Sequence, residues 1–546
     1  MKITIAQLNF QVGNFELNVS KIIDAAQQAV NENADLVVFS ELSICGYPAR
    51  DFLTYEQFVE ECNNALDRIA AANLNVGILV GAPVVNIAEK GKKLFNAAVF
   101  IHEGKVKQVF HKALLPTYDV FDEYRYFEPN STFELLHFKG KKIAVTICED
   151  IWNVGNKNPL YKSSPLDKLI LLQPDFVVNL SASPFSYTQQ HERLQVLKAN
   201  VARYQIPFVY VNQIGAQTEL IFDGGSMVLQ KDGNCLVQLP VFEEKIETVN
   251  VFEEVKTSTE QQIKEPIELI HTALVLGIRD YFKKLGFKKA ILGLSGGIDS
   301  ALVLQLAVEA LGNENVFCLL LPSQFSSQHS IDDALQLCSN LQVKHETISI
   351  QPIFEKLQAQ TEPFFKDLPF NVTEENMQAR ARGILLMAFS NKFGYILLNT
   401  TNKSEAAVGY GTLYGDMCGG ISVLGDVYKT QVYELAKWIN RNGEIIPENI
   451  ITKAPSAELR PNQKDSDSLP EYDLLDKILF AYIEECKDAA EIMAQGFDES
   501  TVKRTLRMVN MNEWKRFQAA PILRVSPKAF GMGRRMPIEG NYKPLS

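Results

Sequence analysis

The stretch Leu292-Gly293-Leu294-Ser295-Gly296-Gly297-Ile298-Asp299-Ser300 decides how the second half of this chain folds. An apolar segment, 290–294, predicts a buried strand before it, and apolar periodicity predicts a helix that begins near Ser300. Its glycines let backbone N–H groups converge on an anion, and the helix N-terminus adds partial positive charge. Ser300 suits a helix cap or a hydroxyl donor. The stretch therefore predicts a phosphate loop, although it lacks the lysine of the Walker loop.

Strands and helices alternate after this loop. We expect strands at 316–321, 346–350 and 395–399 and a helix near 329–341. Such alternation predicts a doubly wound parallel sheet, which binds its ligands at the carboxyl ends of the strands.

The first half predicts a mixed α/β fold in which antiparallel pairs lie among crossover units. Glu103-Gly104 separates two apolar runs and indicates a hairpin, and segment 192–204 has apolar residues at helical spacing. The expected strands are 3–9, 36–40, 76–80, 97–102, 143–148, 176–180 and 208–213.

A polar, charged stretch around 243–265 separates the two patterns. Such a stretch is typical of a linker or an exposed connection. We therefore expect one domain at 1–245, a linker at 246–265 and a second domain at 266–546.

Composition excludes several classes of protein. The chain has 546 residues, of which 54 are basic and 65 acidic, so its net charge of −11 argues against a general nucleic-acid surface. No apolar run approaches the ~18–20 residues that span a bilayer, and the amino terminus lacks a signal peptide's apolar block. The eight cysteines form no C-x-x-C pair, so a zinc cluster is not indicated. We expect a cytoplasmic protein with no nucleic-acid or membrane partner.

The Ser-Gly-Gly-x-Asp-Ser string resembles the loop of ATP pyrophosphatases, which cleave ATP between the α and β phosphates and adenylylate a substrate. NAD synthetases, GMP synthetases, asparagine synthetases and tRNA-thiolating enzymes share it, so it indicates the chemistry but not the substrate. By this resemblance ATP is a co-substrate, and its loop contacts are Leu294, Ser295, Gly296, Gly297, Ile298, Asp299 and Ser300.

Later motifs narrow the choice of family. They are Asn399-Thr400-Thr401-Asn402-Lys403-Ser404-Glu405, Tyr414-Gly415-Asp416, Leu424-Gly425-Asp426-Val427-Tyr428-Lys429-Thr430, Lys453-Ala454-Pro455-Ser456-Ala457-Glu458-Leu459 and Asn512-Glu513-Trp514-Lys515-Arg516. Their order and spacing resemble those of NAD synthetases.

The NAD synthetase resemblance implies roles for individual residues. Thr400, Lys429 and Ser456 would complete the ATP site, and Asp299 and Glu405 would hold Mg²⁺, which prefers carboxylate oxygens. The implied deamido-NAD contacts are Asn376, Arg380, Glu405, Asp416 and Lys515.

Three segments of the first half lie where strand ends could converge: Phe39-Ser40-Glu41-Leu42, His111-Lys112-Ala113-Leu114-Leu115-Pro116 and Thr146-Ile147-Cys148-Glu149-Asp150-Ile151-Trp152. Cys148 ends an apolar strand, which suits a nucleophile held at a cleft. A buried structural cysteine is the alternative. No histidine lies near Cys148 in the sequence, although a distant one could still pair with it.

Together with 120–127, these segments resemble the nitrilase, or carbon–nitrogen hydrolase, superfamily and its Glu-Lys-Cys triad. The resemblance implies that Glu41 is the general base, that Cys148 attacks the side-chain amide of glutamine, and that Lys112 stabilises the oxyanion and the thiolate. Glu149 and Asp150 beside the nucleophile would oppose thiolate formation.

The nitrilase resemblance also implies a glutamine subsite at Tyr118, Ser183 and position 189. The family usually has a basic residue about six positions after the serine, and here that residue is Gln189. The carboxylate of glutamine could therefore rely on another group, such as His191 or Arg193.

The two halves stand in the order that glutamine-dependent NAD synthetases use. The resemblance implies an α-β-β-α sandwich followed by a doubly wound, Rossmann-like parallel sheet of the adenine nucleotide α-hydrolase type. It also implies that deamido-NAD is amidated with ammonia released from L-glutamine. The ammonia would pass between the two sites through a protected tunnel, and the protein would be a homo-oligomer. Two alternatives stay open: an amidotransferase that acts on a different carboxylate, and a carbon–nitrogen hydrolase fused to a nucleotide-binding sensor.

Overall fold

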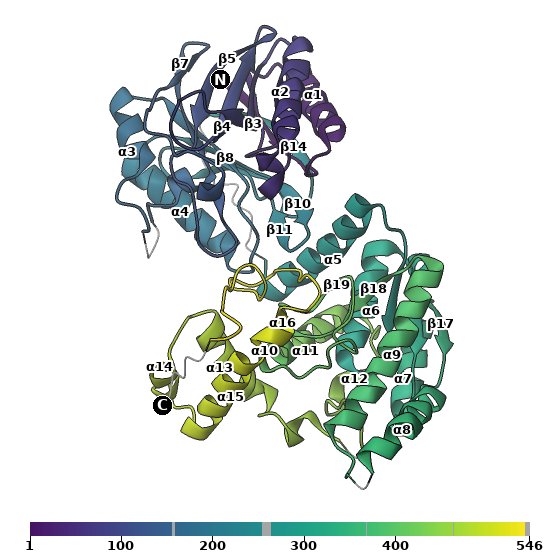
Figure 1. Ribbon diagram of the computed structural model, residues 1–546. Helices are drawn as coiled ribbons and strands as arrows, with labels where there is room; N and C mark the ends of the chain where they lie inside the picture. The colour runs from purple at the N-terminus through teal and green to yellow at the C-terminus, as the bar shows by residue number, and fades with distance from the viewer. Residues whose placement is uncertain (156–158, 254–263, 367, 462, 541–546) are drawn as a thin grey trace. The chain divides into compact units, whose positions relative to one another are not determined.

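The computed structural model describes residues 1–155, 159–253, 264–366, 368–461 and 463–540. The chain forms two compact units, Met1–Lys264 and Glu265–Ser546 (Figure 1).

The first unit contains two six-stranded sheets. One has the order β14-β1-β2-β3-β4-β5, in which β1, β2 and β3 are parallel and the other pairs antiparallel. Its strands are β1 (Lys2–Gln7), β2 (Leu36–Val38), β3 (Gly77–Val85), β4 (Leu94–His102), β5 (Lys105–His111) and β14 (Lys245–Asn250).

The other sheet has the order β13-β12-β9-β8-β7-β6, with β7, β8 and β9 parallel. Its strands are β6 (Leu136–Phe138), β7 (Lys141–Ile147), β8 (Phe176–Ser181), β9 (Phe208–Asn212), β12 (Met227–Leu229) and β13 (Cys235–Gln238). A separate hairpin joins β10 (Ile214–Gln217) to β11 (Leu220–Asp223).

Helices cover the outer face of each sheet. Val37 of β2 packs in one apolar cluster with α1 (Phe15–Asn31) and α2 (Glu56–Ala71), whereas its neighbours Leu36 and Val38 pack in the cluster that the two sheets share. On the second sheet, α3 (Pro165–Leu169) and α4 (Gln189–Tyr204) cover the outer face. Strands buried on both faces have continuous apolar runs, and the result is the expected α-β-β-α sandwich.

The second unit is built on a five-stranded, wholly parallel sheet of order β17-β16-β15-β18-β19. Its strands are β15 (Ala290–Gly293), β16 (Val316–Leu320), β17 (Lys344–Thr347), β18 (Ile396–Asn399) and β19 (Ile421–Ser422). The chain adds β16 and β17 on one side of β15 and β18 and β19 on the other. This reversal creates a crevice at the carboxyl ends of β15 and β18, where doubly wound sheets bind ligands.

Twelve helices of the second unit surround and extend this sheet in the described residues. They are α5 (Pro266–Leu285), α6 (Ile298–Leu311), α7 (Gln328–Leu341), α8 (Gln351–Phe365), α9 (Val372–Phe393), α10 (Lys403–Val408), α11 (Lys429–Ile439), α12 (Glu448–Thr452), α13 (Tyr472–Ile483), α14 (Ala489–Met493), α15 (Glu499–Met511) and α16 (Glu513–Arg516). Short 3₁₀ helices used below are η2 (Glu123–Arg125) and η3 (Cys148–Ile151).

Most expected strands begin or end a few residues away from the observed ones. The strand expected at 346–350 is β17, which lies two residues earlier, because Ile350 is buried as the residue that caps α8 rather than as part of the sheet. The linker expected at 246–265 overlaps β14, which pairs along its whole length with β1. Residues 254–263 of that linker lie outside the described residues.

Within the described ranges, no helix is both long enough and apolar enough to cross a lipid bilayer.

Candidate active sites

Cys148 lies at the point where β7 ends and the turn η3 begins. Its φ angle is 41°, in the left-handed region that residues with a side chain seldom adopt, and it is 5% exposed. Strain of this kind concentrates at functional sites, where the fold holds one side chain in a set direction.

Lys112 and Glu41 form a fully buried ion pair near this turn. Lys112 follows β5 directly, and its Nζ donates to Glu41 Oε1 at 2.7 Å. The backbone N–H of Ala182 donates to Glu41 Oε2 at 3.2 Å. The three predicted residues Glu41, Lys112 and Cys148 interact electrostatically in one buried cluster.

A second carboxylate, Glu123 of η2, completes the cluster. Lys112 Nζ donates to its Oε1 and Oε2 at 2.9 and 2.8 Å, and the Tyr47 hydroxyl donates to Oε1 at 2.9 Å. Burial raises the pKa of Glu123 to about 6, against the opposing effect of Lys112. The sequence analysis included segment 120–127 but gave Glu123 no role. The same segment contains Asp122 and Arg125, so no local signal distinguished Glu123 from its charged neighbours.

The surroundings keep the Cys148 thiol protonated. Burial raises the pKa of Cys148 well above its usual range, Glu41 raises it further, and Lys112 lowers it. Burial also lowers the pKa of Lys112, but Glu123 and Glu41 together raise it well above its usual value. A thiol in this state needs a base that removes its proton before it can act as a nucleophile.

Glu149 and Asp150, the two acids that follow Cys148, have different surroundings. Burial raises the pKa of Glu149 to about 7, and the Tyr118 hydroxyl donates to its two oxygens at 3.0 and 3.1 Å. Asp150 accepts the backbone N–H groups of Ala113, Leu114 and Ile147 at 2.9 to 3.0 Å. These hydrogen bonds of Asp150 connect the turn that contains Cys148 to the segment that follows Lys112.

The expected glutamine contacts lie on several elements. Tyr118 is partly exposed beside Glu149, and Ser183 is buried, with its N–H donating to Asn212 Oδ1 at 2.9 Å. Gln189 is the half-buried first residue of α4.

The two alternatives for the carboxylate of glutamine have different environments. His191 is exposed and contacts Gln195 at 2.7 Å. Arg193 is buried, and its two terminal nitrogens pair with Asp223 at 2.8 and 3.1 Å, so this guanidinium already has a carboxylate partner.

In the second unit, the expected phosphate loop connects β15 to α6. Ser300 Oγ contacts Ser295 Oγ at 3.1 Å and donates to the carbonyl of Gly297 at 3.0 Å, while the N–H of Gly297 donates to Ser295 Oγ at 3.2 Å. Gly296 has a φ of 76°, and a Cβ there would lie 2.1 Å from the carbonyl oxygen of Ser330 in α7. Only glycine fits this close approach of the loop to α7.

Lys429, the first residue of α11, pairs with both predicted metal-binding carboxylates. Its Nζ contacts Asp299 Oδ2 directly and lies 3.5 Å from Glu405 Oε1, and Asn402 Nδ2 donates to Asp299 Oδ1 at 2.9 Å. Burial raises the pKa of Glu405 to about 8, Asp299 adds to this, and Lys429 opposes it. Asp465, which accepts the hydroxyls of Tyr410 and Tyr472 at 3.1 and 3.0 Å, also raises it.

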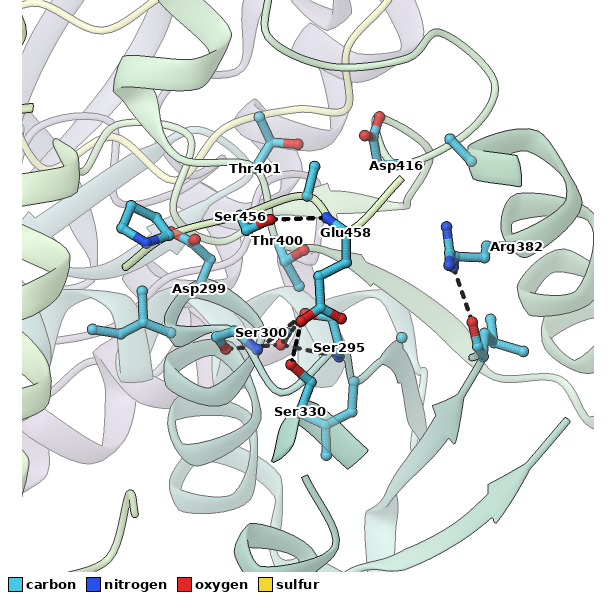
Figure 2. Close-up of a pocket in the computed structure, with 18 of the residues that line it drawn as sticks. Ser295, Asp299, Ser300, Ser330, Arg382, Thr400, Thr401, Asp416, Ser456 and Glu458 are labelled. Atoms are coloured by element: carbon cyan, nitrogen blue, oxygen red, sulfur yellow. Dashed lines mark hydrogen bonds between the residues drawn. The ribbon is translucent and has the colours of Figure 1, made fainter. Parts of the chain in front are cut away.

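These groups line a cavity of about 310 Å³ at the carboxyl edge of the parallel sheet (Figure 2). A cavity of this size lies in the range of small-molecule sites. The predicted ATP residues that line it are Leu294, Ser295, Gly297, Ile298, Asp299, Ser300, Thr400, Lys429 and Ser456. Glu405 and Asp416 also line it, so most of the residues expected at the synthetase site meet in one place.

The other expected dinucleotide contacts converge on segment 409–416. Asn376 Oδ1 accepts the Thr412 hydroxyl at 2.7 Å, and Asp416 accepts the Thr412 N–H at 2.5 Å. Arg380 Nε donates to the carbonyl of Leu413 at 3.2 Å, and Lys515 Nζ donates to those of Gly409 and Gly411 at 2.8 and 3.0 Å. Asn376, Arg380 and Lys515 are outside the cavity lining itself.

Several residues that line the cavity were not predicted, among them Arg382 and Glu458. Arg382 lies across the cavity from Asp299, where burial lowers its pKa to about 10 (Figure 2). Glu458 accepts the hydroxyls of Ser327 and Ser330 at 2.8 and 2.7 Å and joins segment 453–459 to the start of α7. Arg382 lies two residues after the predicted contact Arg380, and Glu458 lies two residues after the predicted contact Ser456. The sequence did not show which of these side chains would face the cavity.

Comparisons with known proteins cover the whole chain. The carbon-nitrogen hydrolase family matches residues 2–259 and the NAD synthase family residues 270–519. A glutamine-dependent NAD(+) synthetase from Synechocystis sp. is 47% identical over 99% of both chains, and one from Acinetobacter baylyi is 41% identical over 100% of this chain and 99% of its own. The solved glutamine-dependent NAD+ synthetase from Acinetobacter baumannii, in complex with ADP, is 39% identical, with a TM-score of 0.77 and 98% coverage of both chains.

The Gly296→Ala variant should weaken nucleotide binding. Its Cβ would meet the carbonyl of Ser330, so either the loop or α7 must move. We expect ATP affinity, measured by titration calorimetry, to fall about tenfold or more. Gly286→Ala is the matched control, because its φ is 77° and nothing lies within 4 Å of the added Cβ. Equal ATP affinity in the two variants would contradict this account of the loop.

The Glu149→Gln variant should stabilise the protein selectively at alkaline pH. The pKa of Glu149 is raised from its usual 4.5 to about 7, so between these values the folded state holds the proton more tightly than the unfolded state. Ionised Glu149 therefore destabilises the fold increasingly as pH rises through this window, by roughly 1–3 kcal/mol at pH 8. Denaturation at pH 5 and pH 8 measures the effect, and an equal change in stability at both would contradict it.

Proposed function

This chain belongs to the glutamine-dependent NAD(+) synthetase family, and we propose that its two units divide the work of that reaction. The first unit releases ammonia from L-glutamine. The second adenylylates deamido-NAD with ATP, and ammonia displaces AMP to give NAD, with diphosphate and L-glutamate as the other products. The observation that carries this proposal is the pair of buried lysine–carboxylate clusters, one beside a strained cysteine and one beside a phosphate loop.

In the glutaminase half, Glu41 takes the proton of the Cys148 thiol, and the thiolate attacks the side-chain amide carbon of glutamine. Lys112 places its positive charge where the thiolate and the tetrahedral oxyanion form. Ammonia leaves with the proton that Glu41 held, and water then hydrolyses the glutamyl thioester with Glu41 as base. The raised pKa of the buried thiol supports a mechanism in which a carboxylate base is required.

The glutamine itself is assigned to Tyr118 and Ser183, which follow the family pattern, and to Gln189, which stands where the family usually has a basic residue. Because Gln189 is neutral and Arg193 is already paired with Asp223, hydrogen bonds rather than an ion pair would hold the carboxylate at this position.

In the synthetase half, a carboxylate of deamido-NAD is a poor electrophile, and transfer of AMP to it creates a good leaving group. The phosphate loop with Thr400 and Ser456 binds ATP, and Lys429 exchanges its carboxylate partners for phosphate oxygens. This exchange stabilises the negative charge that builds up on the leaving diphosphate. Asn376, Arg380, Glu405, Asp416 and Lys515 are assigned to deamido-NAD.

The donor set near the phosphate loop fits Mg²⁺. In the described ranges no group of three or more histidine, cysteine or acidic side chains could hold a metal ion. Mg²⁺ commonly uses one or two carboxylates together with substrate phosphates and water, which matches Asp299 and Glu405. The ion would neutralise phosphate charge there.

Cytoplasmic location and homo-oligomerisation stay predictions.

Product identity separates this function from the two alternatives. The purified protein with deamido-NAD, ATP, Mg²⁺ and glutamine should yield NAD and AMP, identified by mass. An amidotransferase for another carboxylate would form neither product, and a nucleotide sensor would hydrolyse glutamine without consuming ATP. Either outcome would overturn the proposal.

The Cys148→Ala variant should lose synthesis driven by glutamine and keep synthesis driven by high ammonium, because it removes only the nucleophile of the first unit. We expect glutamine-driven turnover to fall by at least about a thousandfold. The control is Cys62→Ala, which changes another buried cysteine of the same unit. Efficient use of glutamine by Cys148→Ala would show that the nucleophile is wrongly assigned.

The Asp299→Ala variant should lose synthesis with both nitrogen sources, since activation by ATP precedes the step that uses ammonia. Glutamine hydrolysis measured alone should remain. Asp473→Ala, at an exposed position of α13, serves as the control and should keep both activities. Turnover of Asp299→Ala near the parent value with either nitrogen source would refute the role of this carboxylate.

A further inference from the structure

Asn96 of β4 contacts three members of the glutaminase cluster. Its Nδ2 donates to Glu41 Oε1 at 2.7 Å and reaches Glu123 Oε2 at 3.4 Å. Its backbone carbonyl accepts the N–H of Lys112 at 2.8 Å. The side chain therefore bridges the two carboxylates while the backbone holds the lysine that neutralises them.

The position of Asn96 in the sheet is one where an apolar side chain would be expected. Ala98 and Phe100, two and four residues later on the same face of β4, pack in the apolar core between the two sheets. Asn96 is 1% exposed, and its Oδ1 is buried with no hydrogen-bond partner in the described part of the chain. A buried acceptor without a donor destabilises the fold. The site therefore uses the Nδ2–H donor of this amide rather than its oxygen.

The hydrogen bonds of Glu41 show what the Asn96 Nδ2–H donor does. Oε1 accepts from both Lys112 and Asn96, which occupies its two lone pairs, whereas Oε2 accepts only the N–H of Ala182. Oε2 is therefore the oxygen of Glu41 that keeps a free lone pair. If the amide of Asn96 were absent, Oε1 would also have a free lone pair, and the carboxylate could rotate.

We propose that Asn96 is a positioning residue for glutamine hydrolysis, which holds the Glu41 carboxylate so that Oε2 takes the thiol proton. In this step the Sγ–H bond of Cys148 breaks and an O–H bond forms at Oε2, which leaves the thiolate. The inference rests on the proposed glutaminase function. The other titratable groups that act on this cluster are Lys112, Glu123, Tyr47, Tyr118, Glu149, Asp150, Tyr161, Arg193 and Tyr210.

The Asn96→Leu variant tests the role directly, because leucine has a similar volume and no donor. We expect the kcat of glutamine hydrolysis to fall about a hundredfold, with the KM for glutamine little changed. Ammonium-driven NAD synthesis should stay at the parent level. Asn18→Leu is the matched control: Asn18 is equally buried, but its amide donates only to the carbonyls of Gln11 and Ile44, so its glutaminase kcat should be retained.

The Asn96→Asp variant gives a readout that a merely structural role would not move. It preserves the shape but replaces the donor with a third acid, and the repulsion among the three carboxylates should shift the low-pH limb of the glutaminase kcat profile to higher pH. If Asn96→Leu fails to fold, the pH profile of Asn96→Asp tests the inference by itself.

Two results would overturn the inference: a kcat for folded Asn96→Leu within about twofold of the parent, or an unmoved low-pH limb in Asn96→Asp. These results are distinct from failure of the proposed function, in which the parent protein itself would not hydrolyse glutamine.

Discussion

The ammonium of Lys112, buried between two carboxylates, is the constraint on which the first unit depends. Three charged groups lie where almost no water reaches, and each is tolerated only because the others are present. Removing one partner of such a network typically costs about 3–5 kcal/mol, because the charges that remain lose their compensation. Burial raises the pKa of the Cys148 thiol, and the carboxylates of Glu41 and Glu123 raise it further against the opposing effect of Lys112, so the thiol stays protonated.

The second unit repeats this arrangement in a site that can exchange partners. Lys429 again faces two carboxylates, Asp299 and Glu405, but these are 18% and 16% exposed and border a cavity, whereas Glu41 is fully buried. A lysine in the cavity can leave a carboxylate for a phosphate group of similar charge. A lysine enclosed by the core keeps its partners. The same ion-pair chemistry thus gives a fixed electrostatic environment in one unit and a ligand-dependent one in the other.

Both sites use the ends of parallel strands, and this accounts for how much could be predicted. Cys148, Thr400 and the phosphate loop each follow an apolar run, so the sequence located them at strand ends. Lys112 follows β5, which is mostly polar and lies after the expected hairpin turn. Contacts that depend on one segment packing over another were missed. Glu123 comes from a short 3₁₀ turn and Asn96 from near the start of β4, and nothing in the sequence around either residue indicates that it reaches the thiol.

The sequence by itself determined the two α/β units and the strand–loop–helix around Gly296, because these depend on local spacing and on the periodicity of apolar residues. The triad was predicted from the resemblance to the nitrilase superfamily, and its roles stay a prediction. Only the tertiary structure decided which charges meet, since a hydrogen bond is set by distances of about 3 Å between segments far apart in the chain. It showed that Glu123 and Asn96 join the thiol cluster and that Arg193 is paired with Asp223. Burial then set the protonation of these groups, which no pattern of residue types expresses.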